Sequence, residues 1–219
     1  SQDFCNHSVA HFFQSVIFNS SEHGIEVYCY SDVEYPDDMT RTIKAGVDSW
    51  RETRSLSHEQ LHHQILGDDI DILVDLMGVT GNCRLELFAR RAAPIQVTYL
   101  GYPNTSGLSR MDYRLTDEIS DPMGMTEAFY TEKLVRLPNS FLCYCANKDS
   151  PAVSDLPAKG NGGNVVFGAF NAFQKLTATT IRLWSEILTK LPSSTLLIKS
   201  GPFHDPEFCG QVFTWFEEF

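Results

Sequence analysis

The run IDILVDL (70–76) is almost continuously apolar, and it limits the folds open to this chain more than any other segment. Such a run predicts a strand that is buried on both faces of a parallel sheet. Segments with helical and with strand-like patterns alternate on either side of it. This alternation is typical of an α/β layered domain, so we expect the α/β fold class.

The expected elements follow from apolar periodicity and from start signals. The first helix covers 8–18 with Ser8 as its N-cap, and another starts at the Ser57–Gln60 capping box and runs to about Leu66. Further helices are expected at 83–91 and 177–191. The expected strands are 25–30, 70–76, 95–100, 112–116, 133–137, 165–170 and 195–200.

A change of composition divides the chain. Residues 147–164 are rich in Pro, Gly and Asn without periodicity, so we expect a linker there. The predicted parts are an N-terminal lobe at 1–146 and the truncated start of a second lobe at 165–219. Both ends look cut, so we expect a fragment of a longer protein. We expect no transferase activity from these 219 residues alone.

Charge and composition exclude several classes of protein. A formal net charge of −11 argues against nucleic-acid binding, and no apolar run approaches the ~18 residues that a membrane span needs. The six cysteines lack metal-type spacing and no signal peptide is visible, so we expect reduced thiols in a cytoplasmic protein, also nuclear if eukaryotic. A secreted disulfide framework is the alternative.

Two loops share one construction. The segments LVDLMGVTGN (73–82) and TYLGYPNTSG (98–107) are apolar runs that end in loops rich in Gly and hydroxyl groups. In open α/β sheets, ligands bind beyond the carboxyl ends of the strands, where such loops converge. The candidate residues in these loops are Gly78, Thr80, Tyr102, Pro103 and Thr105. The alternative is that both loops are only tight turns.

The segment DFCNHS (3–8) places Asp3, Asn6 and His7 just before the first helix. A helix N-terminus offers free amides and a partial positive charge, which suits a phosphate or a developing negative charge. A histidine there can donate to a ligand oxygen, and a carboxylate three to four residues earlier can accept a proton. The alternative is that Asp3 and His7 only satisfy the helix end.

A second candidate is FGAFNAFQKLT (167–177), where a strand ends and a short loop delivers Lys175 just before a helix. A cation at that end opposes the helix dipole, and an anionic ligand would resolve the conflict. The alternative is a lysine pointing to water. The segment contains no P-loop motif.

Two patterns suggest metal ligands but lack the rest of a site. Asp69 and Asp71 lead into an apolar strand, and His58 and His62 have neither a Glu in HExxH register nor an obvious third ligand. We therefore expect no metal site.

Four segments together resemble the catalytic region of protein O-GlcNAc transferases and the related SPINDLY proteins, glycosyltransferase family 41. They are SQDFCNHSVAHFF, the block from IDILVDL to DYRLTD, TEKLVRLPNSFLCY and VVFGAFNAFQKLTATTIRLWSEIL, and they cover nearly the whole chain in register. The resemblance implies a GT-B fold with two Rossmann-like lobes. It also implies a metal-independent, inverting transfer of a monosaccharide from UDP-GlcNAc to Ser or Thr hydroxyls of acceptor proteins, and tetratricopeptide repeats outside this fragment.

By the same resemblance, His7 matches the active-site histidine, Asp3 an aspartate that helps to move the acceptor's proton, and Lys175 the lysine that neutralises the donor diphosphate. Ser8–Val9 and LVRLPNSFLCY are nearer SPINDLY and bacterial members, which makes GDP-fucose an alternative donor. Val79 and Ala172 depart from common family residues, and a non-catalytic relative is a further alternative.

Overall fold

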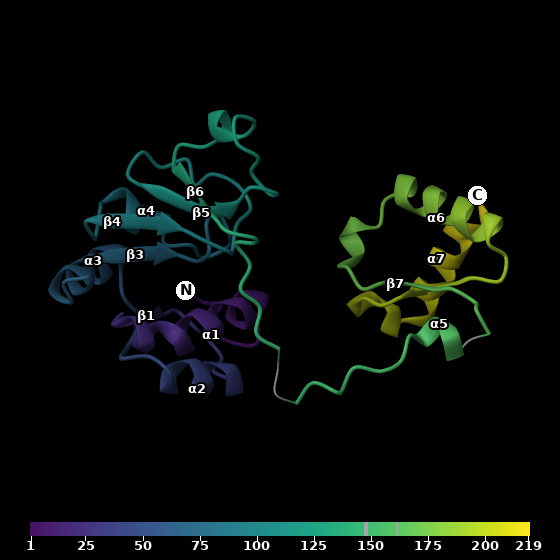
Figure 1. Cartoon of the computed structure of the whole chain (residues 1–219), viewed down its shortest axis with the longest axis horizontal. Coiled ribbons are helices and arrows are strands. Elements are labelled where there is room, and N and C mark those ends of the chain that lie inside the picture. The colour runs from purple at the N-terminus through teal and green to yellow at the C-terminus, as the bar shows by residue number, and fades with distance from the viewer. Residues whose placement is uncertain (147–148, 161) are drawn as a thin grey trace. The chain divides into compact units, whose positions relative to one another are not determined.

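The computed structural model describes residues 1–146, 149–160 and 162–219. The chain divides into two compact units, Ser1–Asp149 and Ser150–Phe219, and each is described by itself (Figure 1). Residues 147, 148 and 161 of the expected linker lie outside the described residues. The part of that linker that is described contains one short helix, α5 (Pro157–Gly160).

The first unit alternates strands with helices. Its strands are β1 (Tyr28–Ser31), β2 (Ser49–Glu52), β3 (Ile72–Asp75), β4 (Ile95–Thr98), β5 (Tyr113–Asp117) and β6 (Lys133–Leu137). Its helices are α1 (Ser8–Ser20), α2 (Asp38–Ala45), α3 (His58–Gly67) and α4 (Leu85–Ala89), with 3-10 turns η1 (Ser21–His23) and η2 (Glu127–Phe129).

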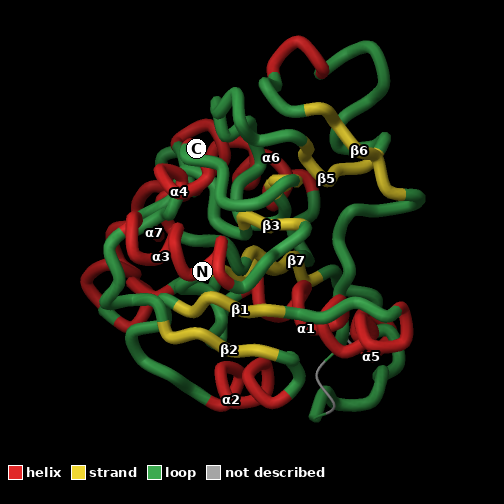
Figure 2. The backbone as a smooth tube through the Cα atoms, turned by 90° about the vertical axis from the view of Figure 1, so that its left-hand side faces the viewer, coloured by secondary structure: helices red, strands yellow, loops and turns green. Residues whose placement is uncertain are grey.

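All strand pairs of this unit are parallel. β1 and β2 form a two-stranded sheet (Figure 2), and a second sheet has the order β3-β4-β5-β6 (Figure 1). The sheets carry helices on both faces, because one apolar cluster joins α1 to Cys29, Leu76 and Tyr99. The other cluster joins α3 and α4 to Leu73 and Met111. This is the layered α/β arrangement that the sequence predicts.

Most expected elements are present with shifted ends. The Ser57–Gln60 capping box is formed as predicted, and β6 covers the expected residues 133–137. β1 starts three residues later than expected, at Tyr28. The sequence reasoning missed α2 and β2. A capping box between Asp37 and Thr40 starts α2, but its threonine replaces the usual Glu or Gln, and β2 has no alternating pattern.

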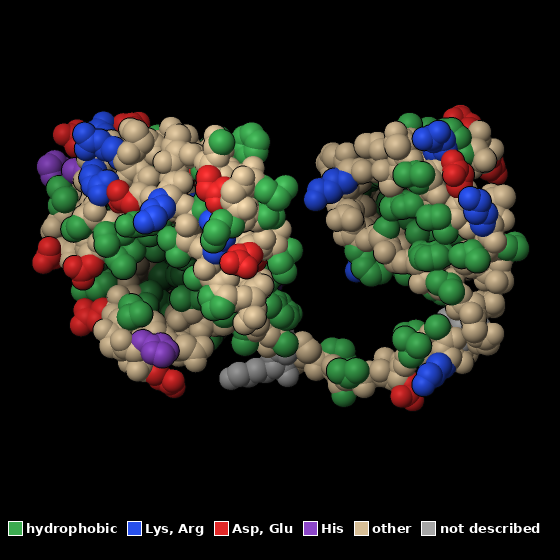
Figure 3. Space-filling model, turned by 45° about the horizontal axis from the view of Figure 1, so that its top comes forward, with side chains coloured by type: hydrophobic (Ala, Val, Ile, Leu, Met, Phe, Trp, Pro, Cys, Tyr) green, Lys and Arg blue, Asp and Glu red, His purple; other side chains and the backbone are tan. Residues whose placement is uncertain are grey.

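The prediction that the 70–76 strand is buried on both faces is wrong for one face. Leu73 and Asp75 are buried, whereas the side chains of Ile72 and Val74 on the other face are 53% and 39% exposed. The side chains of Ile72 and Val74 line a groove and belong to neither of the two apolar clusters of this unit. Figure 3 shows the first unit hollowed, with hydrophobic side chains around the hollow.

The second unit is smaller and repeats the same local plan. Its strands β7 (Val166–Ala169) and β8 (Thr195–Ile198) pair in parallel, and α6 (Ala178–Lys190) connects them through the turn η3 (Phe173–Lys175). The turn η4 (Gly201–His204) and helix α7 (Pro206–Glu217) follow. The rings of Phe203, Phe208 and Trp215 surround Phe173, at 4.6 to 6.1 Å between ring centroids.

Candidate functional site

The two Gly-rich loops leave the same edge of the sheet and pack against each other. β3 and β4 are parallel neighbours, so the loops 78–82 and 101–107 both begin at the carboxyl edge. A Cβ on Gly101 would lie 1.9 Å from the backbone oxygen of Leu76. Gly78 has φ +58°, and a Cβ there would lie 2.2 Å from Cβ of Tyr102. Glycine at both places lets the loops meet.

Hydrogen bonds within the protein engage the hydroxyls of these loops. Thr80 Oγ1 donates to the backbone oxygen of Met77 (3.1 Å), and Thr105 Oγ1 donates to Glu132 Oε2 (2.7 Å). Ser106 donates to the same carboxylate through its backbone N–H (2.7 Å). These groups therefore hold the loops in place rather than reaching for a ligand.

Two buried charged side chains anchor the 101–107 loop. Arg114 donates from Nη1 to the backbone oxygens of Tyr102 (2.9 Å) and Asn104 (3.0 Å). Burial alone would raise the pKa of Glu132, but hydrogen bonds from Ser106 and Thr105 outweigh it and hold that pKa below its usual value. Pro103 is exposed at the tip of the loop.

A second buried carboxylate, that of Asp75, supports the loop 78–82. Asp75 is buried at the end of β3 and accepts hydrogen bonds from the backbone N–H groups of Met77 (3.0 Å) and Gly78 (2.9 Å). Burial raises the pKa of Asp75, and the two amides oppose that shift. The main chain of loop 78–82 is thus fixed at its first turn.

His7, rather than Ser8, caps the N-terminus of α1. The backbone of His7 is extended (φ −135°, ψ 153°), and its Nδ1 accepts a hydrogen bond from Val9 N at 3.3 Å. His7 is therefore the N-cap and Ser8 is the first helical residue, which corrects the expectation that Ser8 caps the helix. The imidazole is half exposed, with 47% of its side chain accessible.

His7 and Asp3 lie together, as their spacing predicts. Nδ1 of His7 is 3.7 Å from Oδ1 of Asp3, whose side chain is only 13% exposed. Because Nδ1 accepts from Val9, the geometry assigns the proton of the neutral ring to Nε2. In that tautomer the ring presents its N–H at Nε2, and the Asp3 carboxylate lies beside Nδ1.

Two long-range contacts hold the segment that carries this pair. Asn6 N donates to Asp37 Oδ2 at 2.6 Å, and Gln2 Nε2 donates to the backbone oxygen of Gly81 at 3.0 Å. The side chain of Asn6 faces back to His11, with Oδ1 3.2 Å from Nε2. Gln2 therefore joins the Asp3–His7 segment to the loop 78–82. The sequence offered no signal for either contact.

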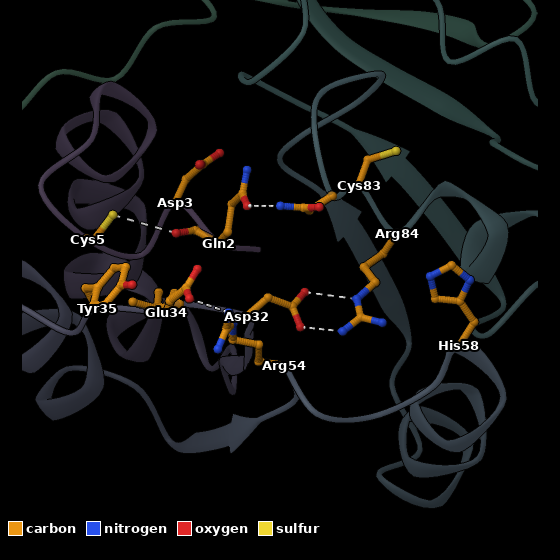
Figure 4. A pocket seen from close by; sticks show the side chains of 12 residues that line it. Gln2, Asp3, Cys5, Asp32, Glu34, Tyr35, Arg54, His58, Cys83 and Arg84 are labelled. Atoms are coloured by element: carbon orange, nitrogen blue, oxygen red, sulfur yellow. Dashed lines mark hydrogen bonds and ion pairs between the residues drawn. The ribbon is translucent and has the colours of Figure 1, made fainter.

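A cavity of about 600 Å³ lies beside this segment and includes Asp3, Cys5, Cys83 and His58 in its wall (Figure 4). Its arginines are already paired. Arg84 makes two hydrogen bonds with Asp32 (2.7 and 3.1 Å), and Arg54 pairs with Glu34 at 2.6 Å. The cavity therefore offers no free cation to a phosphate group.

Lys175 lies in the second unit, at the end of η3 and three residues before α6. Its side chain is exposed, and it forms no ion pair with any described residue. Phe173 fixes this turn, because its ring is packed among aromatic rings and its N–H donates to Ser200 Oγ at 3.1 Å. The lysine is thus held at the carboxyl edge of the β7–β8 sheet by a rigid turn, where the sequence places it.

The structure gives no metal-binding surroundings to the two patterns Asp69/Asp71 and His58/His62 within the described residues. His58 pairs with Glu86 at 2.8 Å. Across residues 1–146, 149–160 and 162–219, no group of three or more His, Cys, Asp or Glu side chains could hold a metal ion. In the same described ranges no helix is long and apolar enough to span a membrane. All six cysteines are free thiols.

Comparison with known proteins places the chain in a family. Residues 1–148 match the model of glycosyl transferase family 41. The chain belongs to glycosyltransferase family 41. The expected family is thereby confirmed.

Relatives in family 41 match most of this chain. A probable UDP-N-acetylglucosamine–peptide N-acetylglucosaminyltransferase SPINDLY from Solanum lycopersicum is 38% identical over 93% of the chain. A UDP-N-acetylglucosamine–peptide N-acetylglucosaminyltransferase from Caenorhabditis elegans is 36% identical over 64% of the chain. The chain spans 22% of the first relative's length and 12% of the second's.

A solved structure of a mutant O-GlcNAc transferase from Thermobaculum terrenum matches the whole chain with a TM-score of 0.91 and 35% identity, and the match covers 41% of that chain. This match and the parallel sheets confirm the expected α/β fold of GT-B type.

Proposed function

We propose that this chain is part of a protein O-glycosyltransferase that transfers a monosaccharide from a nucleotide sugar to Ser or Thr hydroxyls of proteins. The match of residues 1–148 to family 41 carries this proposal. The names of its relatives support a sugar-nucleotide donor and a peptide acceptor. We propose UDP-GlcNAc as the donor for the same reason, with GDP-fucose as the alternative to be tested beside it.

We propose that the first unit orients the acceptor hydroxyl and accepts its proton. In an inverting transfer, the acceptor oxygen forms a bond to the sugar C1, the bond from C1 to the diphosphate oxygen breaks, and the hydroxyl proton must leave. We propose that the N–H at Nε2 of His7 donates a hydrogen bond that orients the acceptor oxygen, and that the nearby Asp3 carboxylate accepts the hydroxyl proton.

The chemistry that we assign to the second unit is stabilisation of the departing diphosphate. Lys175 is exposed and without an ion-pair partner among the described residues, and a rigid turn holds it just before a helix N-terminus. An ammonium carried by that turn suits the negative charge that develops on the leaving group. We propose that it serves where other transferases use a metal ion, so that transfer is metal-independent.

The test uses the full-length protein with UDP-GlcNAc or GDP-fucose, labelled in the sugar, and a protein acceptor. We expect Lys175→Met to lower kcat/KM by ~10²–10³ and to weaken UDP binding, since one lost transition-state donor costs ~3–4 kcal/mol. Lys190→Met, at the far end of the helix α6 that follows Lys175, is the matched control. EDTA should leave transfer unchanged.

For the first unit we compare His7→Asn with Asp3→Asn. Asparagine is a good N-cap, so His7→Asn keeps the helix start and removes only the imidazole. We expect both variants to lose at least ~10²-fold in kcat, the range of acid–base catalysis, while His23→Asn stays at the wild-type rate. Wild-type turnover in both variants and in Lys175→Met would refute these residue roles and leave family membership intact.

A further inference from the structure

Asp37 lies far from His7 in the sequence but contacts the backbone beside it. Its Oδ2 accepts a hydrogen bond from Asn6 N at 2.6 Å, and Asn6 directly precedes His7. The backbone turns tightly here, because His7 N donates to the backbone oxygen of Cys5 at 2.6 Å. A bond to a carboxylate at the centre of so short a turn fixes the peptide group that leads into His7.

The other oxygen of Asp37 caps α2. Oδ1 accepts hydrogen bonds from Thr40 N (2.9 Å) and from Thr40 Oγ1 (3.1 Å). Burial alone would raise the pKa of Asp37, but hydrogen bonds from the backbone of Thr40 and Asn6 outweigh it and lower that pKa, so the carboxylate is charged at neutral pH. One carboxylate therefore serves two elements, with Oδ1 at the start of α2 and Oδ2 at the segment before α1.

The helix that follows Asp37 is anchored in the core of the first unit. Ile43 of α2 is fully buried and belongs to the same apolar cluster as Val9 and Ile17 of α1. Thr40, the capping partner of Asp37, is also buried. Asp37 is therefore an acceptor whose place is set by core packing, and it transmits that place to the segment before α1.

The contacts of the His7 imidazole itself are long. Its side chain is 47% exposed, its Nδ1 lies 3.3 Å from Val9 N, and the same atom lies 3.7 Å from Oδ1 of Asp3. The location of the ring therefore depends on the extended backbone of His7 (φ −135°, ψ 153°). Accuracy matters at such a place, because a misplacement of about 1 Å in a reacting group can cost about 10²-fold in rate.

We propose that Asp37 is a positioning residue for the transfer reaction. Its carboxylate holds the Asn6 amide, and through that amide it holds the imidazole of His7 where the ring can orient the acceptor hydroxyl. This inference rests on the proposed function and deepens it, because it assigns the accuracy of the site to a residue at the start of a different helix. Asp37 itself contacts no substrate in this role, so its loss should lower kcat and leave KM for the nucleotide sugar unchanged.

The substitution Asp37→Ser in the full-length protein separates capping from positioning. Serine is a good N-cap, so α2 keeps its start, but a single hydroxyl on a shorter side chain cannot also reach Asn6 N. We expect the urea midpoint of the first unit to stay at the wild-type value, while kcat falls by about 10- to 100-fold. The Asn6 amide should exchange about tenfold faster, as expected for a lost hydrogen bond to a charged group. Asp37→Ala should show the same fall in kcat together with a lower midpoint.

Two control variants separate positioning from a loss of stability. Ser57→Ala removes the N-cap of α3, so it should lower the urea midpoint about as much as Asp37→Ala and leave kcat unchanged. Asp38→Ser changes the neighbouring carboxylate, whose side chain is 97% exposed, and should alter neither quantity. A fall in kcat of Ser57→Ala equal to that of Asp37→Ala would show that lost stability alone lowers turnover, and it would overturn the proposal.

A double-mutant cycle identifies the residue through which Asp37 acts. In a His7→Asn background, Asp37→Ser should lower kcat by no more than about twofold, because the group that Asp37 places is already gone. A full further loss in that background overturns this inference alone, and so does wild-type kcat in Asp37→Ser when His7→Asn is slow. Wild-type turnover in His7→Asn would instead refute the proposed role of His7 and this inference with it.

Discussion

The substitution Gly101→Ala tests whether the two loops at the carboxyl edge depend on close backbone contact. The added Cβ would lie 1.9 Å from the oxygen and 2.8 Å from the carbonyl carbon of Leu76, and 3.0 Å from Cα of Met77. All three atoms belong to the backbone at the end of β3, which hydrogen bonds to Asp75 hold in place. No rotamer change can relieve the clash, so the backbone must shift by about 1 Å or more to restore van der Waals contact.

Overpacking of this kind costs about 3 kcal/mol in the free energy of unfolding. With a urea m-value of about 2 kcal/mol per M, the unfolding midpoint of the first unit falls by about 1.5 M. The assay is urea-dependent hydrogen exchange of peptides covering β3 and β4, because these peptides report on the first unit alone. In water their slowest amides should exchange about 100-fold faster than in the wild type, as 1.4 kcal/mol is about tenfold.

The matched control is Gly81→Ala in the neighbouring loop. A Cβ there meets no atom within 4 Å, and its φ lies outside the left-handed region, so stability should change by about 0.5 kcal/mol or less. A Gly101→Ala midpoint equal to that of Gly81→Ala would show that the two loops do not depend on this contact.

Two further predictions concern the carboxylates that hold the candidate site. Glu132→Gln should destabilise the first unit by about 2 kcal/mol at neutral pH, because charged hydrogen bonds to Thr105 and Ser106 are lost. The folded-state pKa of Glu132 lies below the unfolded value of about 4.3. Its contribution to the free energy of unfolding is therefore present above that pH and is lost as the pH falls through the folded pKa. Between about pH 5 and 3, the stability of Glu132→Gln, measured by urea unfolding, should therefore fall less steeply than that of the wild type. Asp37→Ala should cost about 1–2 kcal/mol in urea unfolding and speed exchange at the amide of Asn6, whereas Asp37→Asn should keep most of both; equal loss in the two variants would contradict the capping role.

Local signals predicted the elements that depend on local hydrogen bonds and on periodicity. The Ser57–Gln60 capping box starts its helix as expected, and the strand at 133–137 is present with its expected limits. Parallel topology was also enough to predict that the loops 78–82 and 101–107 meet, since neighbouring parallel strands end at one edge. The edge strand β2 was missed, because its four residues show no alternation.

The sequence also placed Asp3, His7 and Lys175 at helix starts, because sequence spacing decides which residues precede a helix. It assigned the cap of α1 to the wrong neighbour. Ser8 is the commoner capping type, but the extended backbone at His7, held by the bond from Asn6 N to Asp37, puts the imidazole in that place.

What the sequence by itself determined is the family, the α/β alternation and the order of the candidate residues along the chain. Only the tertiary structure decided which partners hold the site and its surroundings: Glu132 beneath Thr105, Gln2 against Gly81, and Tyr30 of β1 against Ser1. Each of these contacts joins residues more than twenty positions apart. Their formation depends on how the sheets and helices pack, and no local pattern of residues encodes that.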